Sequence, residues 1–147
     1  MRTVRQLLEA KSHLPHTGTT HTIRPEAPVL DALRLMAEHG IGAVLVMDGP
    51  ALVGILSERD YARKVVLHGR TSADTPVRDI MSADVVTTTS NDSVDRCMQL
   101  MTDRRIRHLP VIDNGDVVGV ISIGDLVKAV IEDQQQELDQ LQRYIAS

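Results

Sequence analysis

An internal repeat constrains this sequence more than any other feature. Val29 aligns with Val94, 65 positions later, and the alignment continues without a gap. The same register matches residues that are not apolar: Gly54 with Gly119, Ser57 with Ser122, and Asp60 with Asp125. Two apolar segments can match by chance, but coinciding Gly, Ser and Asp residues are much harder to obtain. The chain therefore contains two copies of one structural unit.

Each copy begins with a short β segment, at residues 21–24 and 85–89, and continues with an amphipathic helix. Gly40 is a plausible end for the first of these helices. Apolar residues recur at helical spacing in both copies. They are Val29, Ala32, Leu33, Met36 and Ala37 in the first copy, and Val94, Cys97, Met98 and Met101 in the second.

A hairpin and a second helix complete each copy. The predicted strands are 43–47 with 52–56, and 109–112 with 117–121. Asn114-Gly115 between two apolar runs is a strong hairpin signal. A second helix is expected after Ser57 and after Ser122, which gives the order β-α-β-β-α in both copies.

The predicted fold class is α/β, more narrowly α+β, because one copy cannot cover both faces of its small sheet. Two copies packed about a pseudo-twofold axis can. Short helices at 4–8 and 77–81 precede the copies, with Pro76 at the first position of the second one. The expected segments are an N-terminal helix and loop (1–20), repeat 1 (21–67), a linker with a short helix (68–84), repeat 2 (85–133) and a C-terminal helix extension (134–147).

Composition excludes several classes of protein. The net charge is −4, and the chain has no Phe or Trp and only two Tyr, so neither charge nor stacking aromatics favour nucleic-acid binding. Cys97 is the only cysteine, which suits a reducing compartment. Apolar runs are too short for a membrane helix, and the N-terminus does not resemble a signal peptide. We expect a soluble, cytoplasmic protein without a membrane partner.

The sequence offers no recognisable catalytic set. His13, His16 and His21 are loosely spaced, and no second cysteine or His-x-x-x-His pair completes a metal site. Phosphate-loop and Rossmann glycine patterns are missing too. Cys97 lies on an apolar helix face and is interpreted as a small core residue. We expect no metal requirement and no enzymatic activity.

The motif Gly-h-h-Ser-x-x-Asp, where h is apolar, occurs at residues 54–60 and 119–125. It has two interpretations. Ser and Asp three positions apart at a helix start can form a capping box. The same helix start can also attract phosphate, and an Asp carboxylate can accept hydrogen bonds from both hydroxyls of a ribose.

These repeated motifs, with Arg107-His-Leu-Pro-Val before the second hairpin, resemble cystathionine-β-synthase-type (CBS) domains over nearly the whole chain. The strings Ser57-Glu-Arg-Asp-Tyr-Ala and Ser122-Ile-Gly-Asp-Leu-Val are similar to those of small two-repeat CBS proteins of bacteria and plant organelles. The resemblance implies binding of AMP, ADP, ATP, NAD or S-adenosylmethionine in clefts between the repeats.

The resemblance also implies the residues of two sites. In one, Asp60 would bind ribose and Ser57 would support ribose or phosphate, with Arg59 near the phosphate. The other repeat would contribute Thr87, Arg107 and His108 to this site. A basic pair such as Arg107-His108 can equally be a solvated surface feature.

The second site would combine Thr22, Ile23 and Gly42 with Ser122 and Asp125. Here Gly42-Ala43 replaces the basic pair, and Gly124 replaces Arg59. We therefore expect unequal affinities, with the Asp60 site better for charged phosphates.

The last helix is predicted to run to about Ile145. Its apolar residues recur on roughly one face: Val127, Val130, Ile131, Leu138, Leu141 and Ile145. That face either packs on its own module or contacts a second copy. Since CBS pairs commonly dimerise, the resemblance favours a homodimer.

The leading hypothesis is an adenine-nucleotide-binding sensor that regulates an unknown effector protein in trans. A ligand-free interaction scaffold is the first alternative, in which the Ser-x-x-Asp units are only helix caps. A nucleotide-cleaving enzyme is the second, and the lack of an activated nucleophile counts against it.

Overall fold

The computed structural model describes residues 2–12 and 20–146, which form two compact units. The first-repeat unit lies within residues 19–86, and the second-repeat unit combines residues 1–18 with 87–147. Most of the loop predicted within residues 1–20, including His13 and His16, lies outside the described residues. The segment boundaries expected from the sequence stay predictions.

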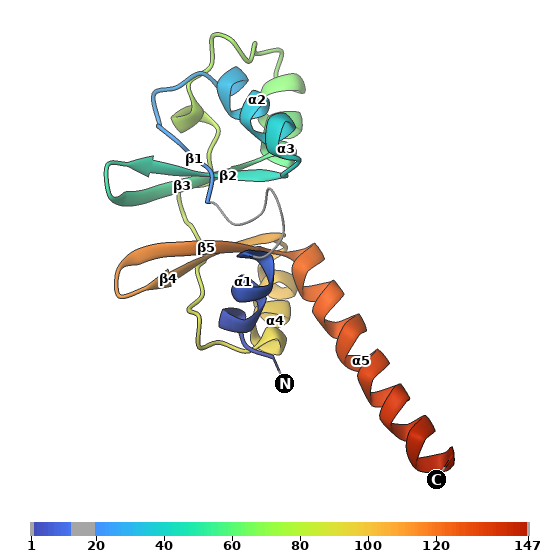
Figure 1. Cartoon of the computed structure of the whole chain (residues 1–147). Coiled ribbons are helices and arrows are strands. Elements are labelled where there is room, and N and C mark those ends of the chain that lie inside the picture. Colours follow the sequence, from blue (N-terminus) through green and yellow to red (C-terminus); the bar gives the residue numbers. More distant parts are fainter. Residues whose placement is uncertain (1, 13–19, 147) are drawn as a thin grey trace. The chain divides into compact units, whose positions relative to one another are not determined.

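Both units have the mixed helix and strand content predicted for the α+β class (Figure 1). The first-repeat unit comprises β1 (Thr22–Ile23), α2 (Val29–His39), β2 (Ala43–Asp48), β3 (Ala51–Ser57), α3 (Glu58–Tyr61), the π-helical turn η1 (Ala62–Val66) and the 3₁₀ turn η2 (Val77–Asp79). The second-repeat unit comprises α1 (Val4–Ser12), α4 (Val94–Arg104), β4 (His108–Asp113), β5 (Asp116–Ser122) and α5 (Ile123–Ala146).

The two hairpins have the same register. β2 pairs antiparallel with β3, and β4 pairs antiparallel with β5. Each ladder shifts at the same place, between Val46 and Met47 in one and between Val111 and Ile112 in the other. Asn114 and Gly115 both have positive φ, as a tight hairpin turn requires. The predicted hairpins and the helices after Ser57 and Ser122 are confirmed.

The third strand differs between the units. β1 lies parallel to β2, and Leu45 N–H donates to the His21 carbonyl at 3.1 Å. In the second-repeat unit the strand predicted at 85–89 is reduced to a bridge between Thr88 and Val111. The position equivalent to Leu45 is Pro110, which has no N–H to extend the ladder. The strand prediction was wrong here because it considered segment 85–89 without the neighbouring strand β4, which contains Pro110.

Helix α2 ends as the sequence predicts. Gly40 follows the helix with φ 62° and ψ 37°, a left-handed conformation that a residue without Cβ adopts easily. At the same position after α4 stands Arg105, with φ 54° and ψ 45°. On the predicted apolar face of α2, Val29, Ala32 and Met36 are buried, but Ala37 is exposed. Its single methyl group loses little by remaining in water.

The matched glycines allow close packing of the segment that precedes each repeat. A Cβ on Gly54 would lie 2.5 Å from Met81 Sδ and 3.1 Å from the Ser82 carbonyl oxygen. A Cβ on Gly119 would lie 2.6 Å from Leu8 Cδ2. The segment before repeat 1 thus packs on β5 of the second-repeat unit, while the segment before repeat 2 packs on β3 of the first-repeat unit.

The helix predicted at 77–81 is only a 3₁₀ turn, Val77–Asp79, and Pro76 precedes it as the N-cap. The backbone is extended again at Ser82, where it exchanges hydrogen bonds of 2.9 and 3.0 Å with Ile55 of β3. This pairing ends the helix early. The N-terminal helix is longer than predicted, since α1 reaches Ser12.

Each unit has its own apolar core. In the first-repeat unit the core comprises Val29, Ala32, Met36, Val44, Val46, Leu56, Val65, Val77 and Ile80. In the second-repeat unit the buried apolar residues include Val4, Leu7, Val94, Cys97, Met101, Leu109, Val111, Ile121, Leu126 and Ala129. Aliphatic and sulfur-containing side chains fill both cores, as the near absence of aromatic residues requires.

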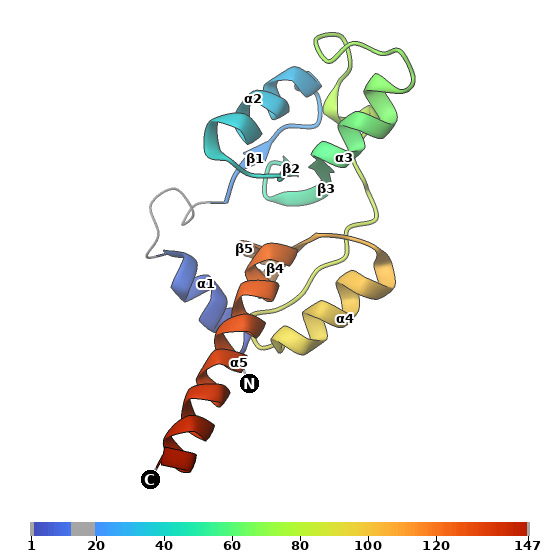
Figure 2. The ribbon, with the colours of Figure 1, turned by 90° about the vertical axis from the view of Figure 1, so that its right-hand side faces the viewer.

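Helix α5 leaves its unit and projects away from it, as two views show (Figures 1 and 2). It extends to Ala146, which confirms the predicted long last helix. No helix within the described residues is both long and apolar enough to span a membrane.

Candidate functional site

Both Ser-x-x-Asp motifs form reciprocal caps at helix starts. In α3, Ser57 Oγ accepts from Asp60 N–H at 3.2 Å, and Asp60 Oδ2 accepts from Ser57 N–H at 2.9 Å. In α5, Ser122 Oγ accepts from Asp125 N–H at 3.2 Å, and Asp125 Oδ2 accepts from Ser122 N–H at 2.8 Å. The capping interpretation is confirmed as local structure.

A cap of this kind does not use all of the hydrogen-bond acceptor capacity of the carboxylate. Each Asp oxygen can accept more than one hydrogen bond. Within the described residues, the hydrogen bonds to Asp60 and Asp125 all go to Oδ2. The caps hold each carboxylate in a fixed orientation at the first turn of its helix, and these hydrogen bonds do not involve Oδ1.

The residue before each hairpin lies against the start of the following helix. The Gly42 carbonyl accepts from Glu58 N–H at 3.0 Å, and the Arg107 carbonyl accepts from Ile123 N–H at 2.8 Å. In the ladders, Ala43 faces Ser57 and His108 faces Ser122. The start of each hairpin therefore lies beside the Ser-x-x-Asp motif of its own repeat.

The basic pair also has neighbours within its own repeat, and its grouping with the other repeat stays a prediction. The family resemblance groups Arg107 and His108 with Ser57 and Asp60 of the other repeat. In the second-repeat unit their neighbours are Ser122 and Asp125, and Gly42 has the equivalent place beside Ser57 and Asp60. The hairpin turn at 114–115 predicts these neighbours within the repeat, because a hairpin pairs the start of its first strand with the end of its second strand.

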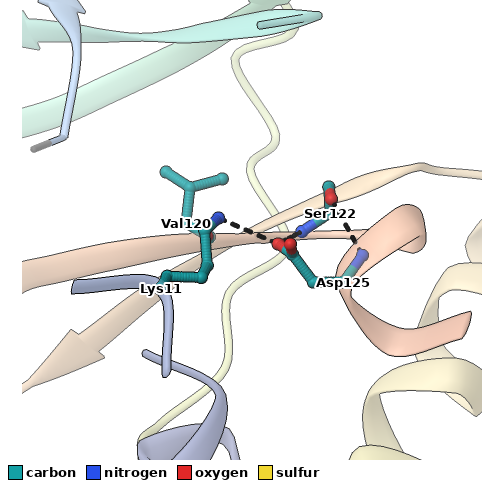
Figure 3. A network of polar contacts seen from close by, with 4 residues as sticks. All are labelled: Lys11, Val120, Ser122 and Asp125. Carbon is teal, nitrogen blue, oxygen red and sulfur yellow. Dashed lines mark hydrogen bonds and ion pairs between the residues drawn. The ribbon is translucent and has the colours of Figure 1, made fainter. Parts of the chain in front are cut away.

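A lysine that the sequence reasoning missed contacts Asp125. Lys11 Nζ, from α1, lies 2.9 Å from Asp125 Oδ2 and donates to the Val120 carbonyl at 2.9 Å (Figure 3). Both side chains of the ion pair are about three-quarters buried, at 25% and 23% exposure. No local sequence pattern predicts this contact, since α1 and α5 are far apart in the chain.

Asp60 also has a lysine neighbour, but a weaker one. Lys64 Nζ lies 3.7 Å from Asp60 Oδ1, one helical turn along the chain, and donates to the Ile80 carbonyl at 3.0 Å. The Lys64 side chain is 43% exposed, so this contact is more strongly screened by solvent. Each carboxylate is thus accompanied by a lysine that is anchored on a backbone carbonyl.

His108 is partly buried in this polar cluster. Burial lowers the pKa of its imidazole below the usual range, while the charge of Asp125 acts in the opposite direction. The charges of Lys11 and Arg107 lower the His108 pKa further. The imidazole is therefore neutral at pH 7, and an added anion would favour its protonation.

The remaining predicted site residues are accessible. Arg59, Arg107, Thr22 and Thr87 are exposed, and Ile23 is half-buried. The assignments of Thr22 and Ile23 to Asp125, and of Thr87 to Asp60, join residues of different units and stay predictions.

His21, which directly precedes Thr22, is a further feature that the sequence did not indicate. Its ring stacks on His39 with the centroids 3.9 Å apart, and its Nε2 is buried without a hydrogen-bond partner among the described residues. Burial, followed by the charge of His39, lowers the His21 pKa.

The structure also bears on metal and thiol chemistry. Among residues 2–12 and 20–146, no group of three His, Cys, Asp or Glu side chains is placed to hold a metal ion. Cys97 is buried, and burial raises the pKa of its thiol. A buried thiol with a raised pKa is a poor nucleophile, which agrees with its interpretation as a core residue.

A family model describes both repeats. The CBS domain model matches residues 16–67 and 77–132, so the chain belongs to the CBS domain family. The mitochondrial CBS domain-containing protein CBSX3 of Arabidopsis thaliana is 46% identical over 122 residues, covering 80% of this chain and 59% of the plant protein. The CBS domain-containing protein YhcV of Bacillus subtilis is 36% identical over 117 residues, covering 78% of this chain and 83% of YhcV.

Solved structures agree with this family. A CBS-domain protein from Burkholderia ambifaria has a TM-score of 0.83 and 53% identity, covering 90% of this chain and 96% of that chain. At 21% identity and a TM-score of 0.77, the CBS domain pair of protein MJ0100 shares the fold; it was solved with 5′-methylthioadenosine and S-adenosyl-L-methionine. A hexameric CBS-CP12 protein from bloom-forming cyanobacteria has a TM-score of 0.74 and 27% identity.

Proposed function

We propose that this chain is a regulatory module that binds an adenine nucleotide (AMP, ADP, ATP or NAD) and acts on a separate effector protein. The observation that carries the proposal is the pair of Asp carboxylates, Asp60 and Asp125, each fixed by a reciprocal cap beside a cation. A fixed carboxylate suits the two hydroxyls of a ribose, and neighbouring cations suit phosphate.

The Asp125 site is the better candidate for charged phosphates. It combines Asp125 and Ser122 with Arg107, His108 and Lys11 of the same unit. We propose Thr22 and Ile23 as its contribution from the other repeat. This reverses the asymmetry expected from the sequence, because the basic pair lies beside Asp125.

The Asp60 site is the weaker candidate for phosphate. It combines Asp60 and Ser57 with Arg59 and the Gly42 backbone, and we propose Thr87 from the other repeat. Its cations, Arg59 and Lys64, are more exposed than Lys11. A less charged adenosine derivative suits this site, and the MJ0100 complex shows that a related fold accommodates such ligands.

Regulation in this module requires a ligand that binds two states with different affinities. We propose a homodimer in the cytoplasm as the working form, without a metal cofactor, nucleic acid or membrane partner. The hexameric cyanobacterial neighbour supports assembly of CBS modules, while the plant relative is mitochondrial. Fractionation of the native host tests the location.

The test is to identify small molecules released from the purified protein by mass spectrometry, together with thermal shifts. A ligand at a hundredfold excess over its Kd stabilises the native state by about 2.7 kcal/mol. We expect a selective shift with one or more adenine nucleotides. No co-purified nucleotide and no shift with AMP, ADP, ATP, NAD or S-adenosylmethionine would contradict the proposal and favour the ligand-free scaffold. Turnover of ATP or NAD that is lost in Asp60→Ala would favour an enzyme.

A further inference from the structure

Helix α5 carries, along most of its length, an apolar stripe that its own unit does not cover. Five of its side chains are strongly exposed: Val127 at 42%, Ile131 at 59%, Leu138 at 52%, Leu141 at 55% and Ile145 at 73%. The face of α5 that packs on the unit is different. It carries the buried Leu126 and Ala129, with Glu132 and Asp133 joined to Arg2 at 2.9 and 3.1 Å.

The spacing of the stripe is that of a heptad repeat. Val127, Ile131, Gln134, Leu138, Leu141 and Ile145 follow one another at alternating intervals of four and three residues. This is the a/d pattern of a two-stranded coiled coil, with Ile131, Leu138 and Ile145 at a and Val127, Gln134 and Leu141 at d. A helix that only packs on a globular unit needs no such strict pattern.

We infer that α5 pairs in parallel with α5 of a second copy of this chain as a short coiled coil. The inference rests on the homodimer part of the proposed function and names its contact. Burying the stripe of both copies removes on the order of 1,000 Å² from water, the lower bound for a specific interface. The seam is short, so its stability depends on the first turns of α5, which the globular unit already holds in helical form.

Two polar residues select the parallel direction. In a parallel pair Gln134 meets Gln134 of the second copy, and two amides satisfy each other as donor and acceptor. In the antiparallel pair with the same apolar layers, Gln134 would face Leu138 and bury an amide without a partner. In the antiparallel pair, Glu137 would also face Glu137 of the second copy, and the two negative charges would repel each other. In the parallel pair, Glu137 faces Gln142 of the second copy.

The direct test is oxidative cross-linking of Leu141→Cys in the full chain. Parallel pairing brings residue 141 of both copies together, whereas antiparallel pairing places it opposite Ile131. We expect a disulfide-linked dimer from Leu141→Cys and none from Gln136→Cys, an outward-facing position on the same helix. The wild type is a control, since its only cysteine, Cys97, is buried. No cross-link at 141, or equal cross-linking at 136, overturns the inference.

Light scattering separates this inference from the homodimer proposal itself. A monomeric wild type overturns both, and a wild-type dimer without the 141 cross-link overturns only the coiled coil. We expect Leu138→Asp to weaken the dimer at least tenfold and Gln136→Asp to leave its affinity unchanged, with unchanged circular dichroism from the globular part. A dimer affinity that Leu138→Asp leaves unaltered contradicts the coiled coil.

Discussion

The two repeats share a register and a fold yet differ in charge. Beside Asp60, the first-repeat unit has the backbone of Gly42, the exposed Arg59 and the partly exposed Lys64. Beside Asp125, the second-repeat unit has Arg107, His108 and a largely buried Lys11. The apolar pattern and the matched pair Gly54 and Gly119 are what the fold requires, so both copies keep them. The polar residues at the hairpin start are free to differ, and they distinguish the two candidate sites.

The largest expected effect concerns the matched glycines. Gly54→Ala should lower the free energy of unfolding by about 2–3 kcal/mol, because the new Cβ would approach both Met81 and the Ser82 backbone. Gly119→Ala should cost about 1–2 kcal/mol, since only the end of the flexible Leu8 side chain has to move.

Urea unfolding of both variants measures this difference. If Gly119→Ala lowers the free energy of unfolding more than Gly54→Ala does, the packing around Gly54 is not tighter than the packing around Gly119. A matched control is Gly49→Ala, at a turn where a Cβ meets nothing within 4 Å but φ is +59°. The loss of unfolding free energy in Gly49→Ala therefore measures the effect of backbone strain without any effect of close packing.

The next effect concerns pH. Burial lowers the His108 pKa below its ordinary value of 6.5, and a bound phosphate would raise it again. Binding then takes up a proton, so affinity should rise as pH falls. NAD is a suitable probe because its diphosphate bridge keeps its charge. We expect its affinity to rise by about three- to tenfold between pH 7.5 and pH 6.0.

The control for the pH effect is His108→Gln, which should bind NAD with an affinity that does not change with pH. Calorimetric titration at both pH values gives the result. A wild-type affinity that is flat with pH, or a rise that persists in His108→Gln, would place His108 outside the phosphate site.

The smallest effect concerns the helix ends. Arg105 after α4 has the left-handed conformation that Gly40 adopts after α2. Arg105→Gly should stabilise the protein by about 0.5–1 kcal/mol, and Gly40→Ala should destabilise it by about 1 kcal/mol. Thermal unfolding measures both. Destabilisation by Arg105→Gly would indicate that the arginine side chain makes a contact worth more than the backbone strain.

Much of the fold could be predicted from the sequence because the repeat fixes two copies of every element at once. Gly40, the turn at 114–115 and the Ser-x-x-Asp motifs give local signals that act within a few residues. Pairing between distant segments was harder to predict. The effect of Pro110 depends on which strand lies beside it, and the helix at 77–81 is cut short by a distant strand.

The candidate site shows the same limit. The caps formed by Ser57, Asp60, Ser122 and Asp125 could be predicted because their motif is local and repeated. Lys11 could not, since its contact with Asp125 joins segments far apart in the chain. The neighbours of Arg107 and His108 within their own repeat follow from the hairpin register, while their grouping with Asp60 stays a prediction.

The central claim, that the basic pair serves the Asp125 site, is tested most directly by a double-mutant cycle on nucleotide affinity. We expect the effects of Arg107→Gln and Asp125→Asn on affinity to be strongly non-additive, because both residues act on one bound ligand. Arg107→Gln and Asp60→Asn should add independently. Coupling of Arg107 to Asp60, with additivity between Arg107 and Asp125, would contradict this claim and favour the grouping that the family resemblance implies.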